Sequence, residues 1–268
     1  MAALVGLVAC EGGLPSPSRV DSLRILAMPT ETPAVRPGLS ATVRAVWFDP
    51  QALRRRTFLW RVCPETEGFD PRDCARPSVG TTLQRSEAEG VTVPSERLGA
   101  VGRVVVWVLL CPGDEAVVDA GEGRLRCGGT EGFEAFRRLT VSAEGPWPPP
   151  PAVLTWTLSR GDRRVSLAES PATVSGLGAC AGDCPAWEVA VTADPARLHP
   201  EARLLASFLA TSGVYSRPRD ALAEGESLRP LTAGFVPERV PGEVRVWVVL
   251  RDQQGGEDAR ETVLRLAE

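Results

Sequence analysis

The chain has 268 residues, a formal net charge of −4 at pH 7 and a single histidine. A negative balance lacks the electrostatic footprint of a nucleic-acid-binding protein, so no nucleic-acid partner is expected. The length suits two domains of about 100–140 residues, each large enough to bury a core of its own.

The first residues of the chain are apolar and end at a cysteine. Leu7-Val8-Ala9-Cys10 resembles the lipobox of bacterial lipoproteins. This resemblance implies that residues 1–9 are a leader that is removed, and that Cys10 carries a lipid with acyl chains such as palmitate. The leader is shorter than an ordinary signal peptide and has no charged start. The alternative is an apolar N-terminus with a free thiol at Cys10.

Residues 10–21 are rich in Gly, Pro and Ser, which is typical of a flexible tether. Eleven extended residues reach roughly 35 Å. If Cys10 is lipidated, this tether would hold the first folded domain just off a membrane surface.

Residues 22–142 contain short apolar or β-branched runs separated by Pro and Gly, which predicts an all-β domain. In the third run, Trp60 and Arg61 fall on opposite faces of the strand. The predicted strands are Leu23–Met28, Leu39–Phe48, Arg55–Cys63, Val91–Val93, Val104–Cys111 and Phe136–Val141.

Residues 143–151 include four consecutive prolines and predict a stiff linker, with a ligand for a proline-binding module as the alternative. Residues 152–268 form the second predicted domain. Residues 200–211 could instead form a helix that starts at Pro200, but their alignment with the Trp60 strand favours a strand. The predicted strands are Val153–Ser159, Val165–Leu167, Trp187–Ala193, Leu204–Leu209, Val244–Leu250 and Thr262–Leu266.

Two landmarks recur in the same order in both predicted domains. Trp107 and Trp247 lie in similar β-branched runs and are 140 positions apart. Asp49 and Asp194 follow similar apolar runs, are each followed by Pro, and are 145 positions apart. Two matches at nearly one offset indicate that the domains repeat one fold.

The order of short strands, with Trp60 on the third, resembles an immunoglobulin-like sandwich of the kind found in tandem in bacterial surface proteins. The fold class implied is all-β, with two tandem immunoglobulin-like antiparallel β-sandwiches. One hallmark is missing, because no cysteine lies on the second strand to pair with the sixth.

The seven cysteines predict local disulfides. If Cys10 carries lipid, six remain, and they are predicted to pair as Cys63–Cys74, Cys111–Cys127 and Cys180–Cys184. Cys63 and Cys111 end neighbouring antiparallel strands at opposite ends of the sheet, beyond the reach of a disulfide. Either longer loop, once closed, contributes about 3 kcal/mol of stability in the chain-entropy model. Such use of cysteine implies an oxidising compartment.

The residues for catalysis or metal binding are sparse. His199 lies in a turn, and without a second histidine most base-assisted nucleophiles and zinc sites lose their usual residue. The paired acids Asp114-Glu115 and Glu257-Asp258 are expected at solvated hairpin tips, although paired carboxylates keep a glycoside hydrolase open. We predict no enzyme activity, no cofactor and no metal.

One surface could bind a partner. In the second Trp-containing strand, Trp247 lies between Arg245 and Arg251 on the face opposite the predicted core, and Trp107 occupies the matching place in the first domain. These four side chains could form an apolar, cationic surface for a partner or a glycan. The alternative is that neighbouring strands, the linker or the other domain cover both indoles.

Together these features predict a non-catalytic lipoprotein of the bacterial cell envelope, periplasmic or on the outer membrane. It would be held by its N-terminal lipid and act as a binding or spacer module, with an envelope protein or a glycan as partner. The alternative function is a carbohydrate-binding or accessory subunit of a surface complex.

Overall fold

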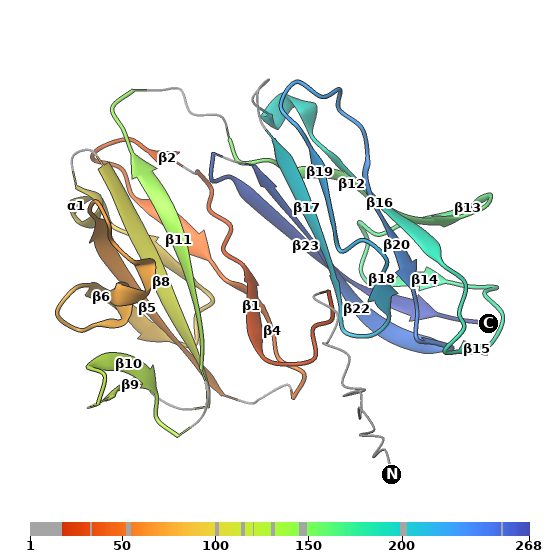
Figure 1. The fold of residues 1–268 in the computed structure, drawn as a ribbon, viewed down its shortest axis with the longest axis horizontal. Helices are drawn as coiled ribbons and strands as arrows, with labels where there is room; N and C mark the ends of the chain where they lie inside the picture. Colours follow the sequence, from red (N-terminus) through yellow and green to blue (C-terminus); the bar gives the residue numbers. More distant parts are fainter. Residues whose placement is uncertain are drawn as a thin grey trace, which may run out of the picture.

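The computed structural model describes residues 18–32, 34–51, 55–99, 102–113, 116–119, 121–129, 132–144, 149–198, 203–252 and 254–268. Cys10 and His199 lie outside these residues, as do Asp114, Glu115 and most of the predicted tether. Figure 1 shows two β-rich halves side by side, with β1 and β4 on the side of the first half that faces the second.

The first half is built from short strands that end at Pro, Gly or polar turns. They are β1 Arg24–Ala27, β2 Ala34–Val35, β3 Ala41–Arg44, β4 Val46–Phe48, β5 Arg56–Glu65, β6 Thr81–Ser86, β7 Gly90–Val93, β8 Gly102–Pro112, β9 Ala116–Asp119, β10 Arg124–Cys127 and β11 Phe133–Val141. A 3₁₀ helix at Pro71–Ala75 and the single turn α1 at Ser95–Leu98 connect them.

The second half has the same character. Its strands are β12 Val153–Arg160, β13 Arg163–Ser166, β14 Ala172–Val174, β15 Cys180–Ala181, β16 Trp187–Ala193, β17 Leu204–Ala210, β18 Val214–Tyr215, β19 Arg219–Leu222, β20 Leu231–Val236, β21 Arg239–Val240, β22 Gly242–Asp252 and β23 Glu257–Leu266. A 3₁₀ helix at Pro195–Arg197 follows β16.

Both halves are β-sandwiches, and their five-stranded sheets share the strand order of an immunoglobulin-like fold. A five-stranded sheet runs β2-β11-β8-β5-β6 in the first half and β14-β23-β22-β17-β19 in the second. In each sheet the outermost short strand, β2 or β14, is parallel to its neighbour, and the other pairs are antiparallel. The opposite layer is the sheet β13-β12-β16-β20-β18 in the second half, and the pairs β1-β4 and β3-β7 in the first.

The repeated landmarks occupy equivalent places. Trp107 on β8 pairs with Arg61 on β5, and Trp247 on β22 pairs with Leu209 on β17. The two aspartates also build the same turn: the Asp49 carboxylate accepts a hydrogen bond from the backbone N–H two residues on at 2.8 Å, and that of Asp194 does so at 3.0 Å. The halves therefore share this turn as well as the strand order of their five-stranded sheets.

Each half has an apolar core between its layers. One cluster of buried side chains draws on residues from Met28 to Val141, and includes Phe58 and Trp60 at 0% exposure. The other draws on residues from Trp156 to Leu266. Alternate residues of β5, β8, β17 and β22 face these cores, as expected for a strand with one face on a sandwich interior.

Several predicted elements differ in the structure. Leu39–Phe48 is two strands, because the chain changes partner at Ala45 from β7 to β1. Leu204–Ala210 is a strand, so the helix alternative over these residues is wrong. β20 was not among the predicted strands, although its buried Leu231, Ala233 and Phe235 alternate with less buried neighbours. β6 and β19 were not predicted either, because their polar sequences become strands only by pairing with β5 and β17.

Candidate functional site

The predicted surface at Trp107 is wrong, because this indole is 1% exposed. Its Nε1 donates a hydrogen bond to Glu134 Oε2 at 2.9 Å. Leu59, Leu109 and the cysteines of two disulfides pack around it in a cluster outside the main core. The loops held by these disulfides therefore cover the outer face of the first five-stranded sheet.

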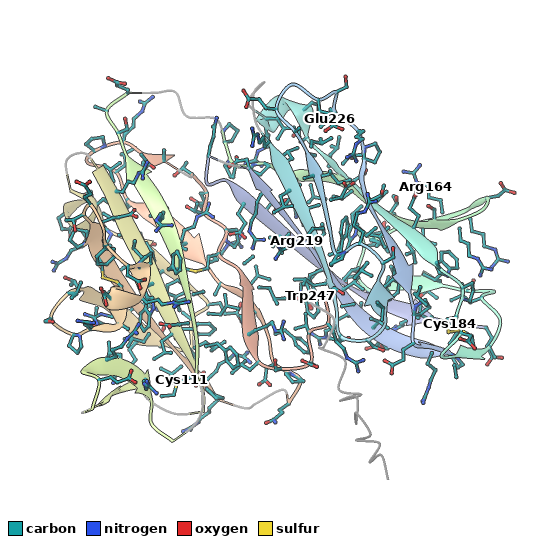
Figure 2. The ribbon with its side chains drawn as sticks, in the orientation of Figure 1. Cys111, Arg164, Cys184, Arg219, Glu226 and Trp247 are labelled. Carbon is teal, nitrogen blue, oxygen red and sulfur yellow. A yellow bond between two sulfur atoms is a disulfide. The ribbon has the colours of Figure 1, made fainter. Side chains whose placement is uncertain are left out.

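Trp247 is also fully buried, but residues of the first half of the chain cover it. Its exposed fraction is 0%, and it packs with Val20 and Leu26, which precede or belong to the first strand of the chain. Phe48 of β4 meets the indole edge-on, with ring centroids 5.2 Å apart. Figure 2 shows Trp247 on the side of the second half that faces the first. The partner surface is therefore wrong here too, and the alternative is confirmed, because the other half of the same chain covers this indole.

A buried ion cluster lies beside Trp247 in the same seam. Glu257, 4% exposed, accepts hydrogen bonds at Oε2 from Met28 N at 3.1 Å and Arg137 Nη1 at 3.2 Å. Arg251 Nη2 lies 2.6 Å from Glu257 Oε1 and donates to Leu26 O at 3.2 Å. Burial lowers the pKa of Arg137, against the opposing effect of Glu257. The contacts with Met28, Arg137 and Leu26 cross from the first half to the second, so Glu257 and Arg251 both belong to the seam.

The position of Glu257-Asp258 corrects a second expectation. The pair was predicted at a solvated hairpin tip, but both residues belong to β23. The side chain of Asp258 is 20% exposed, and its Oδ2 accepts from Val153 N at 2.9 Å. Their charges serve structural hydrogen bonds in the described part of the chain.

The residues before β1 also cross the seam. Ala210 N donates to Ser18 O at 2.9 Å, and Val20 N donates to Ala210 O at 2.8 Å, which adds a parallel bridge to the edge of β17. β19 pairs with β17 only as far as Ser207, so the chain fills the edge position beyond it. Ser18 and Val20 are at most 1% exposed. The segment predicted as the end of a free tether is thus docked on the second half.

Three disulfides join the cysteine pairs named from the sequence. The Cα atoms are 5.9 Å apart in Cys63–Cys74, 5.4 Å in Cys111–Cys127 and 5.3 Å in Cys180–Cys184. Cys63 is opposite Val105, and Cys111 is opposite Thr57, which places the two bridges of the first half at opposite ends of the sheet. Figure 2 shows Cys111 and Cys184 in different halves of the molecule.

Arg61 lies beneath the Cys63–Cys74 loop and is only 2% exposed. Its Nη2 donates to Pro77 O at 3.1 Å and to Gly80 O. Burial lowers the pKa of this guanidinium. Gly80 has no room for a side chain, because a Cβ there would collide with Cys63 Sγ. The guanidinium therefore organises the loop that covers Trp107.

A cleft of about 880 Å³ lies between the two halves. Arg245, the fourth residue of the predicted surface, lines it with a side chain that is 53% exposed. The first half contributes Arg44, Trp47, Arg56 and Glu89, among others. Such a size is within the range of small-molecule sites. The structure thus brings Arg245 to a cleft whose other wall contains no residue of the predicted site.

Trp47 and Arg56 are the notable additions. The guanidinium carbon of Arg56 lies 3.9 Å from the centroid of the Trp47 ring system, and Phe58 meets that ring edge-on at 6.0 Å. The sequence feature that could have pointed to Trp47 is the Trp-Phe-Asp-Pro run at 47–50. This run contains Asp49, one of the repeated landmarks, but its position beside β22 and β23 depends on how the halves dock.

Two further observations bear on chemistry. Among the described residues, no group of three or more His, Cys, Asp or Glu is arranged to hold a metal ion. Nor does the described part of the chain include a helix long and apolar enough to cross a membrane.

No protein-family model and no curated protein matches the chain. Among solved structures, the Ig1-2 module of the Drosophila receptor protein tyrosine phosphatase DLAR is similar at 13% identity and TM-score 0.29, covering 92% of this chain and 99% of its own. E. coli alpha-2-macroglobulin is similar at 12% identity and TM-score 0.26, covering 91% of this chain and 17% of its own. The chain thus spans about a sixth of that protein's length. The immunoglobulin-like architecture here follows from the chain's own strand order and pairing.

Proposed function

We propose that this protein is a non-catalytic module of the bacterial cell envelope, tethered to a membrane through lipid at Cys10, that binds a partner or holds one at a fixed distance. The buried seam between its halves carries the proposal. Trp247 at 0% exposure and Glu257 at 4% leave little freedom for a hinge. A rigid two-domain bracket suits a spacer or a preformed binding site.

The cysteines support the proposed location. Three disulfides within two small β-sandwiches suit an oxidising compartment such as the periplasm or the cell surface. Docking of Ser18–Val20 on β17 leaves seven residues between Cys10 and the folded body. Seven extended residues reach roughly 25 Å, so the body would sit close to the membrane.

Lipidation is tested by expressing the full chain in a bacterial host fed with labelled palmitate. We expect label in the wild-type chain, recovery in the membrane fraction, and loss of both in Cys10→Ala. Cys180→Ala is the control for loss of a cysteine elsewhere and should keep the label. An unlabelled wild-type chain would refute the tether and leave the binding proposal to be judged separately.

The alternative function, a carbohydrate-binding or accessory subunit, is favoured by the cleft. Its walls combine a half-buried Trp47 with Arg245 and several carboxylates, and these groups can both donate to and accept from hydroxyls. A glycan array with the wild-type chain tests it, together with a hydrolase screen. Binding that Arg245→Gln weakens and Arg219→Gln, on edge strand β19, leaves intact supports the cleft. Hydrolysis of a bound glycan would refute the non-catalytic assignment.

A further inference from the structure

We propose that the sheet β13-β12-β16-β20-β18 of the second half binds the same sheet of a second copy of this chain, related to the first copy by a two-fold axis that runs nearly along β12. Neither the lipid at Cys10 nor the cleft is needed for this contact. Three features favour it: the outer face of the sheet is open, its centre is uncharged, and the charges on the two sides of β12 match under the two-fold axis.

The outer face of this sheet is open, in contrast to the faces that carry Trp107 and Trp247. Disulfide loops cover the first of these indoles, and the first half of the chain covers the second. The sheet with β12 is the opposite layer of the second half, so its outer face points away from the first half. Figure 1 shows β13 on the far side of the molecule. Leu154, at a bulge of β12 beside Thr155, is 59% exposed.

The centre of this face consists of short, uncharged side chains. On β12 and β16 they are Thr155, Thr157, Ser159, Ala190 and Thr192. They point outward because the residues between them, such as Leu158 and Val189, are buried in the core. The hydroxyls of Thr155 and Thr192 hydrogen-bond to each other at 2.5 Å, which lowers the cost of removing them from water. Such a surface suits the centre of an interface, where charged residues are depleted.

Two opposite charges flank this centre at one level of the sheet. Arg164 of β13 is opposite Ser159 of β12, and Ser159 is opposite Glu188 of β16. Residues paired in this way point to the same face, and both charged side chains are exposed. Within the part of the chain that the structure describes, neither has an ion-pair partner. A two-fold rotation about β12 exchanges its two sides, so it places Arg164 of each copy over Glu188 of the other.

The same axis accounts for the exposed leucine and for the orientation of the two copies. Leu154 lies on the axis strand, so it meets Leu154 of the second copy and both are removed from water. A rotation about β12 also keeps the direction of that strand, so Ser18 of both copies lies at the same level along the axis. Two chains tethered to one membrane could therefore make this contact.

The expected strength follows from the size of the overlap. β13, β12 and β16 of each copy face one another, which gives a width of about 15 Å at roughly 5 Å per strand. Such a contact is smaller than a standard protein interface. We therefore expect a weak, reversible dimer.

Sedimentation velocity of the full chain over a range of concentrations tests the contact, with Cys10→Ser in every sample so that neither lipid nor a free thiol can associate. We expect a monomer–dimer equilibrium with a Kd on the order of 10–100 μM. Arg164→Glu and Glu188→Arg should each weaken the dimer about tenfold or more, because like charges then face each other at two symmetric positions. An equal mixture of these two variants should dimerise at least as tightly as the wild type, since opposite charges then meet at both positions.

The mixture separates a contact between copies from a contact within one chain, because only the former is restored by mixing. Arg219→Glu, on β19 of the other sheet, is the matched control and should dimerise as the wild type does. Leu154→Ala reverses no charge and should weaken the dimer about tenfold, with the unfolding free energy of the monomer nearly unchanged.

Three outcomes would refute the proposal. The first is a wild-type chain that stays monomeric at every concentration reached. The second is a dimer that tolerates both charge reversals, which would place the contact on another surface. The third is a mixture of the two reversed variants that stays monomeric although each variant keeps the wild-type circular dichroism spectrum and thermal unfolding.

Discussion

Trp247 shows how much one side chain can depend on a distant part of the chain. Its strand alternates so that Val246 and Val248 face the core of the second half, which leaves the indole on the outer face. The outer face of a sandwich sheet is ordinarily solvated. Here Phe48 and Val20 cover it, so the indole is a structural residue of the seam.

Trp247→Ala should therefore destabilise the protein by about 3–5 kcal/mol, the usual cost of a large cavity in place of an aromatic side chain. Urea unfolding followed by circular dichroism measures the change. Leu154→Ala is the control, since Leu154 is 59% exposed and should change stability by about 0.5 kcal/mol at most. A Trp247→Ala variant as stable as the wild type would mean that the indole is not packed as described.

Asp220 is another residue whose role depends on its neighbours. It is 8% exposed and accepts hydrogen bonds from Arg229 Nη1 at 2.8 Å, Thr232 N at 2.9 Å and Ala221 N at 2.9 Å. Burial acts to raise the pKa of this carboxyl, but the hydrogen bonds and the charge of Arg229 outweigh it, and the pKa is lowered. The carboxylate joins β19 to β20, one strand from each layer.

Because the folded-state pKa lies below the unfolded value of about 3.9, the carboxylate contributes its full stability above that pH. The contribution is lost as the pH falls through the folded-state pKa. Asp220→Asn should cost about 1–3 kcal/mol at pH 7, and the difference from the wild type should shrink below about pH 4. Unfolding free energies measured across pH check this, and a difference that does not change with pH would contradict it.

Among the elements, the segment before β1 has the most consequence. Ser18–Val20 completes the β17 edge by backbone hydrogen bonds, which need no particular side chains and are hard to read from sequence. The first half is thus joined to the second at both of its ends, through this bridge and through the linker after β11. Such a connection restrains rotation of one half on the other.

Val20→Pro should release this segment, because proline cannot donate the hydrogen bond to Ala210 O. We expect the Ala210 amide, which donates to Ser18 O, to exchange with deuterium much faster in the variant. Phe208 lies on the same strand as Ala210, and its amide donates to Pro218 O. This amide is the internal control and should keep its protection. Unchanged exchange at Ala210 would show that the bridge does not protect this edge.

The disulfides differ in what they constrain. Cys111–Cys127 spans 16 positions and Cys180–Cys184 spans 4. In the chain-entropy model, replacing both cysteines by serine should cost about 3 kcal/mol for the first bridge and about 2 kcal/mol for the second. Denaturant unfolding of the two double variants measures the difference. A larger cost for Cys180–Cys184 would show that strain or packing, and not loop length, decides.

As a whole, the molecule should behave as one cooperative unit. Two sandwiches joined only by a linker would unfold independently, whereas a buried indole and a buried ion cluster at the seam couple them. The cluster is costly to break, because Glu257 and Arg137 are nearly removed from solvent.

Glu257→Ala should leave Arg137 buried without its partner at a cost of about 3–5 kcal/mol. Differential scanning calorimetry should show one transition in the wild type and two in the variant, as the halves uncouple. Glu188→Ala, at an exposed position of β16, is the control and should keep one transition. Two transitions in the wild type would mean that the seam does not couple the halves.

Most of the fold could be predicted from local patterns. Alternation in Trp187–Ala193 and the β-branched runs around Trp107 and Trp247 specify strands wherever the chain places them, because side-chain period and backbone sterics are local. The disulfide pairs could also be predicted from the sequence, since Cys63 and Cys111 lie near the ends of antiparallel strands that keep them apart. Edge strands such as β6 and β19 were missed because they exist only through their partners.

The candidate site could not be predicted in the same way, because it belongs to both halves at once. Whether Trp247 is a binding surface or a seam residue depends on whether Phe48 docks against it, and alternation along β22 is the same in either case. The cleft between Arg56 and Arg245 likewise exists only after docking. The strands, the turns and the disulfides follow from interactions between residues that are near one another in the sequence. The burial of Trp247 and the presence of the cleft depend on which apolar faces meet. Packing over the whole molecule decides which faces those are.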